Sequence, residues 1–170
     1  MDFEWVKNYL EKNNSGASSN DIDSMPFAIF EPLIMSGLKI DLIKRGRVIC
    51  SMKVPPRLLN EDRSLHGGAT AALVDVVGGV VIPTINNATS SGVSMEINVS
   101  YVDSSCVGDE IEIEAKTLRV GKVVAVSTVE FRNKKTGKIF AQGRHTKYLV
   151  VSMERYEETI TIYIFSWMSC

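Results

Sequence analysis

The residues Leu65, His66, Gly67 and Gly68 lie directly before an apolar segment in which Asp75 is the one charged residue. These are residue types that occur in chemical sites. Where such a segment forms a helix, the free backbone N–H groups at its N-terminus and the helix dipole can stabilise negative charge on an oxygen atom. A glycine there allows a reacting group to approach the backbone closely. A carboxylate surrounded by apolar side chains is suited to take up a proton as a general base. The stretch therefore predicts an anion-stabilising group and a base on one helix.

Helix geometry separates these two groups. Asp75 follows His66 by nine residues, which corresponds to about 13.5 Å along a helix axis and roughly 180° around it. A single helix therefore cannot bring both to the same reacting atom. If both groups act on one substrate, the carboxylate comes from a second copy of the chain, and the site is predicted at the interface of a symmetric dimer.

The segment 68–82 is predicted to be a central helix. Apart from Thr70 and Asp75 it is apolar on all sides, which suits a helix surrounded by other parts of the protein. Its valines also permit a strand, but about fifteen residues is long for a strand, and its alanines favour a helix. Pro83 is expected to end this helix.

The rest of the chain is predicted to form strands and short helices. The expected elements are a helix over 2–12, a flexible linker over 13–24, a helix over 26–35 that Gly37 terminates, two strands joined at 45–47 within 38–52, and strands over 92–101, 109–118, 122–132 and 138–150. The fold class is therefore α+β, with about six antiparallel strands around one long helix. The chain divides into an N-terminal helix and linker (1–25), a main domain (26–151) and an apolar tail (152–170).

Composition indicates a globular protein in a reducing compartment. Of the 170 residues, 45% are hydrophobic and 23% are charged, which suits one domain with a core. A net charge of −1 argues against nucleic acid as the main partner. The widely spaced Cys50, Cys106 and Cys170 indicate neither a disulfide framework nor a zinc site. No secretory signal is visible, and the apolar stretch 159–168 is half of the roughly 20 residues that span a bilayer. A cytoplasmic protein without stable membrane insertion is expected, with the peroxisome or mitochondrion as alternatives.

Several short motifs along the chain carry a family resemblance. They are Asn60 six residues before His66, then Leu65–Gly68, Leu73–Asp75, Gly92–Ser94 and Gly143–Lys147. Together they resemble the hotdog-fold acyl-CoA thioesterases, in particular the acyl-CoA thioesterase 13 (thioesterase superfamily member 2) branch and its plant members. The resemblance covers roughly residues 30–150 and implies a sheet wrapped around the central helix. The tail departs from it, and Met168–Cys170 is not a peroxisomal signal of the Ser-Lys-Leu type.

The resemblance implies that acyl-CoA is hydrolysed to a free acid and coenzyme A, without a metal or redox cofactor, by a homodimer that pairs into a homotetramer. In this reaction Asp75 is the base or the nucleophile, Ser94 positions Asp75 or the water, and the Gly67 amide holds the carbonyl oxygen. Asn60 and His66 bind near the thioester or its leaving sulfur. Coenzyme A is expected along strand surfaces near Tyr101, Arg119, Gly121, Lys122 and Tyr148, where the two cationic side chains could meet phosphates.

Each of these residues also has a purely structural interpretation. His66 could cap the helix, the glycines could permit tight packing, and Asp75 could form a salt bridge with a distant Arg or Lys. Ser94 could be an ordinary strand residue. The basic residues could form a solvated sheet face, namely Arg119, Lys122, Arg144 and Lys147. Two other functions are open to the same fold: a dehydratase or hydratase that acts on a thioester, and a non-catalytic acyl-CoA binder.

Overall fold

The computed structural model describes residues 29–86 and 92–149, which form two compact units divided at Ser36 and Gly37. The first unit contains the helix α3 (Phe30–Met35), which ends where the sequence predicts. Gly37 follows with a φ of +88°, the left-handed conformation that commonly terminates a helix. The helix expected over 2–12, the linker over 13–24, the tail over 152–170 and the domain boundaries lie outside the described residues.

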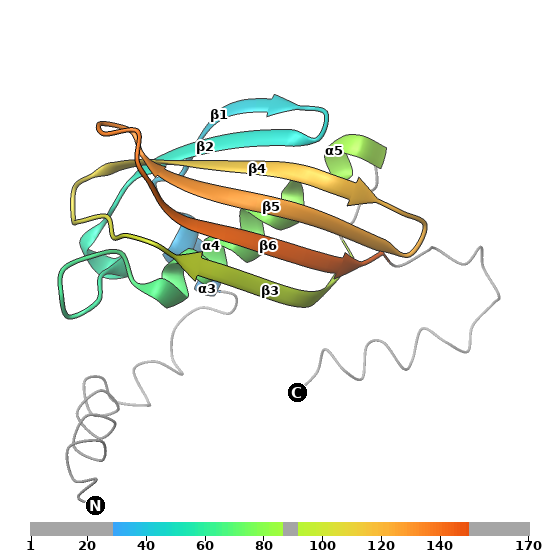
Figure 1. Cartoon of the computed structure of the whole chain (residues 1–170). Coiled ribbons are helices and arrows are strands. Elements are labelled where there is room, and N and C mark those ends of the chain that lie inside the picture. The colour runs from blue at the N-terminus through green and yellow to red at the C-terminus, as the bar shows by residue number, and fades with distance from the viewer. Residues whose placement is uncertain (1–28, 87–91, 150–170) are drawn as a thin grey trace, which may run out of the picture. The chain divides into compact units, whose positions relative to one another are not determined.

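Six antiparallel strands form the sheet of the second unit as far as it is described (Figure 1). They are β1 (Lys39–Lys44), β2 (Arg47–Lys53), β3 (Val93–Tyr101), β4 (Glu110–Val120), β5 (Val124–Asn133) and β6 (Ile139–Tyr148). Their order across the sheet is β1-β2-β4-β5-β6-β3, so β1 and β3 are the edge strands. A single 3-10 turn, η1 (Pro56–Leu58), follows β2. The strands predicted from the sequence are confirmed, with ends that differ slightly.

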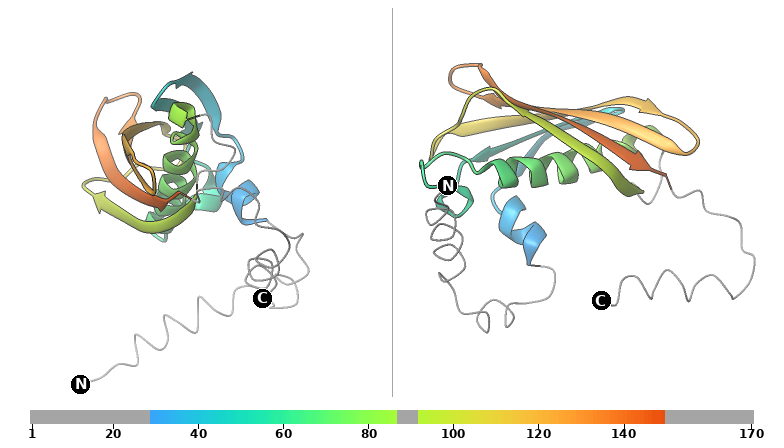
Figure 2. Two further views of the ribbon diagram at one scale, coloured as in Figure 1. Left: turned by 90° about the vertical axis from the view of Figure 1, so that its right-hand side faces the viewer. Right: turned by 60° about the horizontal axis from the view of Figure 1, so that its bottom comes forward.

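The sheet curves around the long helix α4 (Gly67–Val80), as Figure 2 shows. Along β4, Ile111 and Ile113 are fully buried, while Glu110, Glu112 and Glu114 alternate with them and lie on the outer face. The core therefore fills the space between the inner face of the sheet and α4, where Leu73 and Val77 of the helix are also buried. This arrangement is the predicted hotdog fold, and α4 ends before Pro83, which starts the short helix α5 (Pro83–Asn86).

Two glycines allow the helix and the sheet to pack closely. A Cβ atom on Gly143 of β6 would lie 2.5 Å from Cγ2 of Val74. A Cβ atom on Gly78 of α4 would lie 3.1 Å from Oγ of Ser127, whose hydroxyl donates a hydrogen bond of 2.7 Å to the Gly78 carbonyl oxygen. The backbones of β5, β6 and α4 therefore approach to distances that larger residues do not allow.

The sheet covers α4 on one side, whereas the sequence predicted a helix surrounded on all sides. The helix residues that are half-buried or exposed include Gly68, Ala71, Ala72, Asp75, Val76 and Val80. They recur at intervals of three and four residues and so form one face, which we refer to as the open stripe of α4. By length and composition alone the helical span Gly67–Ile85 could cross a membrane, but half of it is buried inside the protein, as is expected of a core helix.

Candidate functional site

The N-terminus of α4 presents an unpaired backbone N–H group. His66 is the N-cap residue, and its Nδ1 accepts a hydrogen bond of 2.9 Å from the backbone N–H of Gly68. The backbone N–H of His66 donates to the carbonyl oxygen of Leu58 at 2.8 Å. Between them, the Gly67 N–H has no acceptor among the described residues. This group, at the positive end of the helix dipole, can bind an anionic oxygen. His66 therefore caps the helix, as its structural interpretation expected.

Asn60 shapes the loop that leads into α4. Its side-chain Oδ1 accepts hydrogen bonds from the backbone N–H of Ser64 at 3.0 Å and from Ser64 Oγ at 3.1 Å. With Oδ1 held in this way, the two N–H donors of the amide have no acceptor within the described part of the chain. Asn60 and Gly67 therefore offer free donors on either side of His66.

Tyr101, the last residue of β3, is tied to the first turn of α4. Its hydroxyl donates a hydrogen bond of 2.8 Å to the carbonyl oxygen of Gly67. Because this carbonyl belongs to the residue whose N–H is free, the bond from β3 restrains the orientation of the anion-binding group. The structure thus gives Tyr101 a contact that sequence reasoning did not assign.

A second cluster brings together three side chains from three elements. The Ser94 hydroxyl on β3 donates a hydrogen bond of 2.9 Å to Asp75 Oδ1 on α4. His145 on β6 places Nε2 at 2.9 Å from Ser94 Oγ and at 3.3 Å from Asp75 Oδ1. The imidazole is fully buried, whereas the Asp75 side chain is 48% exposed. The partner of Asp75 is therefore a histidine, and no Arg or Lys of the described chain forms an ion pair with it.

The environment of His145 fixes the direction of these hydrogen bonds. Burial, and secondarily the charge of Lys147, lower its pKa, so the ring is neutral at pH 7. Its Nδ1 is buried without a hydrogen-bond partner. We assign the ring proton to Nε2, which has Ser94 Oγ as its acceptor. With the proton there, Nδ1 is only an acceptor, and no N–H group is buried without a partner. His145 then donates to Ser94, Ser94 donates to Asp75 Oδ1, and Asp75 Oδ2 is left to accept a proton from another molecule.

Two expectations about this cluster are wrong. Asp75 was expected to be desolvated by its apolar neighbours, but the stripe on which it lies is open within one chain, and the carboxylate is half-exposed. Lys147 was among the residues expected on a solvated face, but it is 6% exposed, on the inner face of β6. Sequence reasoning also missed His145 as a partner of Asp75. Alternate residues of a strand face opposite sides of the sheet, so the strand predicted over 138–150 could have placed His145 on the same side as Asp75. That inference requires knowing which side of the strand faces α4.

The chain's stability is expected to fall as the pH drops below about 6.5, the ordinary pKa of histidine. Burial holds the pKa of His145 below that value in the folded state, so between the two pKa values the unfolded chain binds more protons. Urea unfolding at about pH 7.5 and about pH 5.5 measures the difference. The same comparison on His145→Gln should show a weaker pH dependence. An equal dependence in both proteins would assign the effect to other groups.

One chain keeps the two clusters apart. Gly67 and Asp75 are eight residues apart on α4, which corresponds to about 12 Å along the helix axis. The predicted separation of the anion-binding group and the carboxylate is therefore confirmed within a single chain.

The residues expected to contact coenzyme A lie at two ends of the sheet. Arg119, Gly121 and Lys122 lie at the β4–β5 turn and line a depression of about 430 Å³ together with three valines. Tyr148 is nearby, because it pairs with Val124 of β5. Tyr148 also pairs with Val93, eight residues before Tyr101 on β3, which is about 27 Å in an extended strand. Tyr101 is therefore remote from the other four within one chain.

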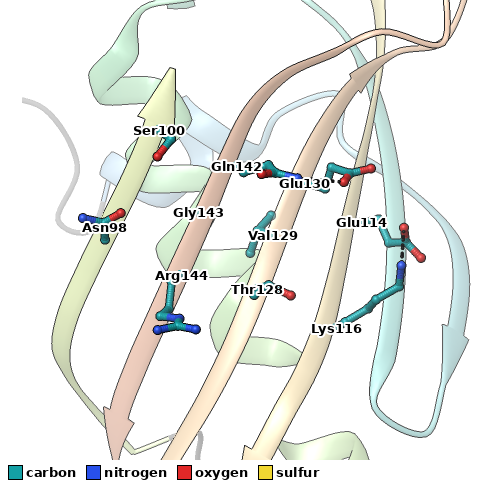
Figure 3. Close-up of a pocket in the computed structure, with 10 residues that line it drawn as sticks. All are labelled: Asn98, Ser100, Glu114, Lys116, Thr128, Val129, Glu130, Gln142, Gly143 and Arg144. Atoms are coloured by element: carbon teal, nitrogen blue, oxygen red, sulfur yellow. Dashed lines mark hydrogen bonds and ion pairs between the residues drawn. The ribbon is translucent and has the colours of Figure 1, made fainter. Parts of the chain in front are cut away.

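A further pocket, of about 310 Å³, lies on the outer face of the sheet (Figure 3). It is lined by Asn98, Ser100, Glu114, Lys116, Thr128, Val129, Glu130, Gln142, Gly143 and Arg144. Figure 3 shows that polar side chains from β3, β4, β5 and β6 gather there. The pocket contains none of the predicted site residues. Within the described residues there is also no cluster of three or more His, Cys, Asp or Glu side chains that could hold a metal ion.

Comparison with known proteins identifies the family. The thioesterase superfamily model matches residues 63–140, a range that contains both clusters' residues on α4 and β3. Human acyl-coenzyme A thioesterase 13 is 42% identical over 113 residues, which are 65% of this chain and 80% of the human protein. The chain belongs to the thioesterase superfamily.

Solved structures agree with the fold of this thioesterase. The crystal structure of zebrafish thioesterase superfamily member 2 superposes with a TM-score of 0.67 and 37% identity, and covers 75% of this chain and 88% of that chain. Thioesterase superfamily member 2 from mouse has a TM-score of 0.65 and 35% identity, with 71% of this chain and 90% of that chain covered. In this thioesterase the long helix and the sheet therefore adopt the arrangement of its relatives.

Proposed function

We propose that this thioesterase hydrolyses acyl-CoA to a free carboxylic acid and coenzyme A, at sites that two subunits share. The observation that carries the proposal is the Asp75 carboxylate, which is fixed at one oxygen by Ser94 and open at the other. The similarity of the chain to human acyl-coenzyme A thioesterase 13 supports the choice of substrate class.

In the proposed reaction Asp75 is the general base. Its Oδ2 takes a proton from a water molecule as the water oxygen bonds to the thioester carbonyl carbon. The carbonyl oxygen becomes an oxyanion, which the free Gly67 N–H and the helix dipole stabilise. Collapse of this intermediate breaks the C–S bond, and the leaving thiolate of coenzyme A takes up the proton. Asn60 lies in the loop that leads into α4 and His66 directly precedes Gly67, and both would bind near the thioester. The reaction consumes one water and requires neither a metal nor a redox cofactor.

Two subunits are needed because Gly67 and Asp75 are too far apart on one helix. The open stripe of α4 consists of small and apolar residues around Asp75, which suits close packing against a second helix. If two α4 helices pack antiparallel with Ala71 at the centre, Gly67 of each helix lies level with Asp75 of the other, since 67 and 75 are equally distant from 71. The exposed apolar residues on the edge strand β3, Val93, Met95 and Ile97, add surface for the same contact. The partner also covers Asp75, which supplies the desolvation missing in one chain.

Complementation between two inactive chains tests the shared site. One chain carries Asp75→Asn, and the other carries Asn60→Ala with His66→Ala. After co-expression with different tags and purification through both tags, each mixed dimer has one intact site. Because a doubly tagged tetramer can also contain unmixed dimers, about a quarter to a half of the wild-type rate of thiol release is expected. Each variant alone serves as the control. Activity no higher than that of the parents would place both groups in one chain, and binding of acyl-CoA without any thiol release from the wild type would contradict hydrolysis.

Tyr101→Phe tests the anion-binding half of the site. Loss of the hydrogen bond to Gly67 should lower kcat by about 2- to 10-fold, the worth of one ordinary hydrogen bond, with KM for acyl-CoA little changed. Tyr148→Phe at the other end of the sheet is the matched variant, and its kcat should stay near the wild-type value. A rise in KM without a fall in kcat for Tyr101→Phe would instead support the coenzyme A contact that the sequence suggested.

The proposal extends to assembly and location. The depression beside Arg119 and Lys122 would take the phosphates of coenzyme A. Dimers would pair into a tetramer, which sedimentation equilibrium can measure. Cys50 and Cys106 are free thiols, which supports a reducing compartment such as the cytoplasm.

A further inference from the structure

The loop over 60–66 starts at Asn60 and ends directly before the free N–H of Gly67, and we refer to it as the donor loop. It makes a tight turn, in which the Arg63 N–H donates to the Asn60 carbonyl oxygen at 3.1 Å. Arg63 has a φ of +60°, and of the described residues other than glycine it alone has a positive φ. A side chain disfavours this left-handed conformation by about 5- to 30-fold. The shape of the donor loop therefore depends on the contacts that hold it.

A turn over 105–109, directly before β4, supplies such contacts from another part of the chain. Two backbone hydrogen bonds and a β-bridge join this turn to the donor loop. They run from the Val107 N–H to the Arg63 carbonyl oxygen at 3.2 Å, from the Leu65 N–H to the Ser105 carbonyl oxygen at 2.8 Å, and between Ser64 and Cys106 as an antiparallel bridge. The path of the donor loop therefore follows the path of this turn.

The Asp109 carboxylate closes the 105–109 turn. Its Oδ2 accepts hydrogen bonds from the Cys106 backbone N–H at 2.9 Å and from the Ser105 hydroxyl at 3.2 Å. Ser105 is 1% exposed, so bulk water does not readily replace the bond to its hydroxyl. The backbone of Asp109 is held separately, because its carbonyl oxygen accepts from the N–H of Val54, the residue after β2, at 2.9 Å. Asp109 therefore connects the turn to the sheet.

We propose that Asp109 is a positioning residue of the hydrolytic site. Its carboxylate stabilises the 105–109 turn, and the turn holds Arg63 in the left-handed conformation. This inference rests on the proposed function, in which Asn60 and Gly67 bind at the thioester. A donor stabilises developing charge only where it is already aimed at the position of that charge. If the turn loosens, Arg63 returns to a negative φ and the donor loop changes its path. Asn60 is affected more than Gly67, whose carbonyl oxygen is also held by the β3 tyrosine.

The first test compares kcat and KM for Asp109→Ala. With the turn loosened, the productive loop conformation becomes a minor one, so kcat for thiol release should fall by about 5- to 30-fold. KM should change much less, because in the proposed reaction the donor loop acts on the thioester and does not hold coenzyme A. Asp109→Asn keeps an acceptor oxygen and should retain most of the wild-type kcat. Asp103→Ala is the matched control, since the exposed Asp103 accepts only from the neighbouring Ser104 N–H, at 2.8 Å.

A double variant separates positioning from general damage. Glycine adopts a positive φ without steric cost. Arg63→Gly combined with Asp109→Ala should therefore recover kcat to within about 3-fold of that of Arg63→Gly alone. A general loss of stability would not be recovered, because glycine makes the unfolded chain more flexible. If Asp109→Ala is insoluble, Ser105→Ala removes one of the two hydrogen bonds and should give a smaller fall in kcat with the same recovery.

Amide hydrogen exchange tests the hold of the turn without any activity. In Asp109→Ala the Leu65 N–H should exchange faster, while the N–H of Ile113 in β4 should keep its wild-type rate. If the wild type releases no thiol from acyl-CoA, hydrolysis is wrong, and the exchange rates still decide whether Asp109 holds the donor loop. If the wild type is active, three results would overturn the role of Asp109: a wild-type kcat in Asp109→Ala, an unchanged exchange rate at Leu65, or no recovery in the double variant.

Discussion

We expect Asp75→Asn to lower kcat for acyl-CoA hydrolysis by about 10²- to 10⁴-fold, the range that a well-placed general base contributes. Asparagine has nearly the same size as aspartate, and its oxygen can still accept the hydrogen bond from Ser94. It cannot take up a proton from water, so the loss should fall on the chemical step. KM should change little, because in the proposed reaction the carboxylate acts on the attacking water and does not bind coenzyme A. A thiol-reactive dye that reports free coenzyme A measures both constants.

Ser94→Ala is the control for this variant, since it removes the group that orients the carboxylate while the base itself remains. Its loss in kcat should be smaller than that of Asp75→Asn. Both proteins should keep the wild-type oligomeric state in size-exclusion chromatography, which separates a catalytic defect from an assembly defect. Wild-type turnover by Asp75→Asn would remove Asp75 from the mechanism.

A large effect on stability is expected from Gly143→Ala. The added Cβ would lie 2.5 Å from Cγ2 and 2.8 Å from Cγ1 of Val74, closer than carbon atoms approach without strain. The cost of such overpacking is about 1–3 kcal/mol in the free energy of unfolding, because β6 and α4 must move apart along the core. Urea unfolding at a fixed protein concentration measures this cost.

A second substitution shows whether the contact with Val74 is the cause. Val74→Ala removes both methyl groups that the new Cβ meets, and alone it should destabilise the protein by leaving a small cavity. Combined with Gly143→Ala, it should cost less than the sum of the two single changes, because the alanine Cβ fills the vacated space. Additive costs in this double-mutant cycle would show that the strain lies elsewhere.

The sequence predicts elements well where one physical pattern dominates. The alternation of isoleucine and glutamate in β4 predicts a strand whose isoleucines face the core, since only one face of the strand can be buried. The separation of Gly67 and Asp75 is equally secure, because the rise of a helix is the same in every protein. For these features the sequence suffices, because it predicts both the buried face of β4 and the separation of the two groups along α4.

The environment of the Asp75 carboxylate could not be predicted, because no single pattern in the sequence determines it. From Gln142 to Tyr148, β6 has no alternation of polar and apolar residues that would identify its inner face. Its pairing with β3 and β5 is what turns His145 and Lys147 inward. In the same way, the half-exposure of Asp75 depends on which side of α4 the sheet covers, and an all-apolar helix does not indicate that side.

The hydrogen bond from Tyr101 to Gly67 has a consequence for chains that have not yet assembled. It connects the oxyanion donor to β3, which is also an edge strand with exposed apolar residues. In the proposed dimer the contact that places the partner's Asp75 near Gly67 also restrains β3. Because Tyr101 on β3 bonds to Gly67, the same contact restrains the Gly67 N–H donor. A newly made single chain would have no partner Asp75 beside its Gly67 N–H and would hold that donor less firmly. It would therefore not hydrolyse acyl-CoA until two copies have assembled.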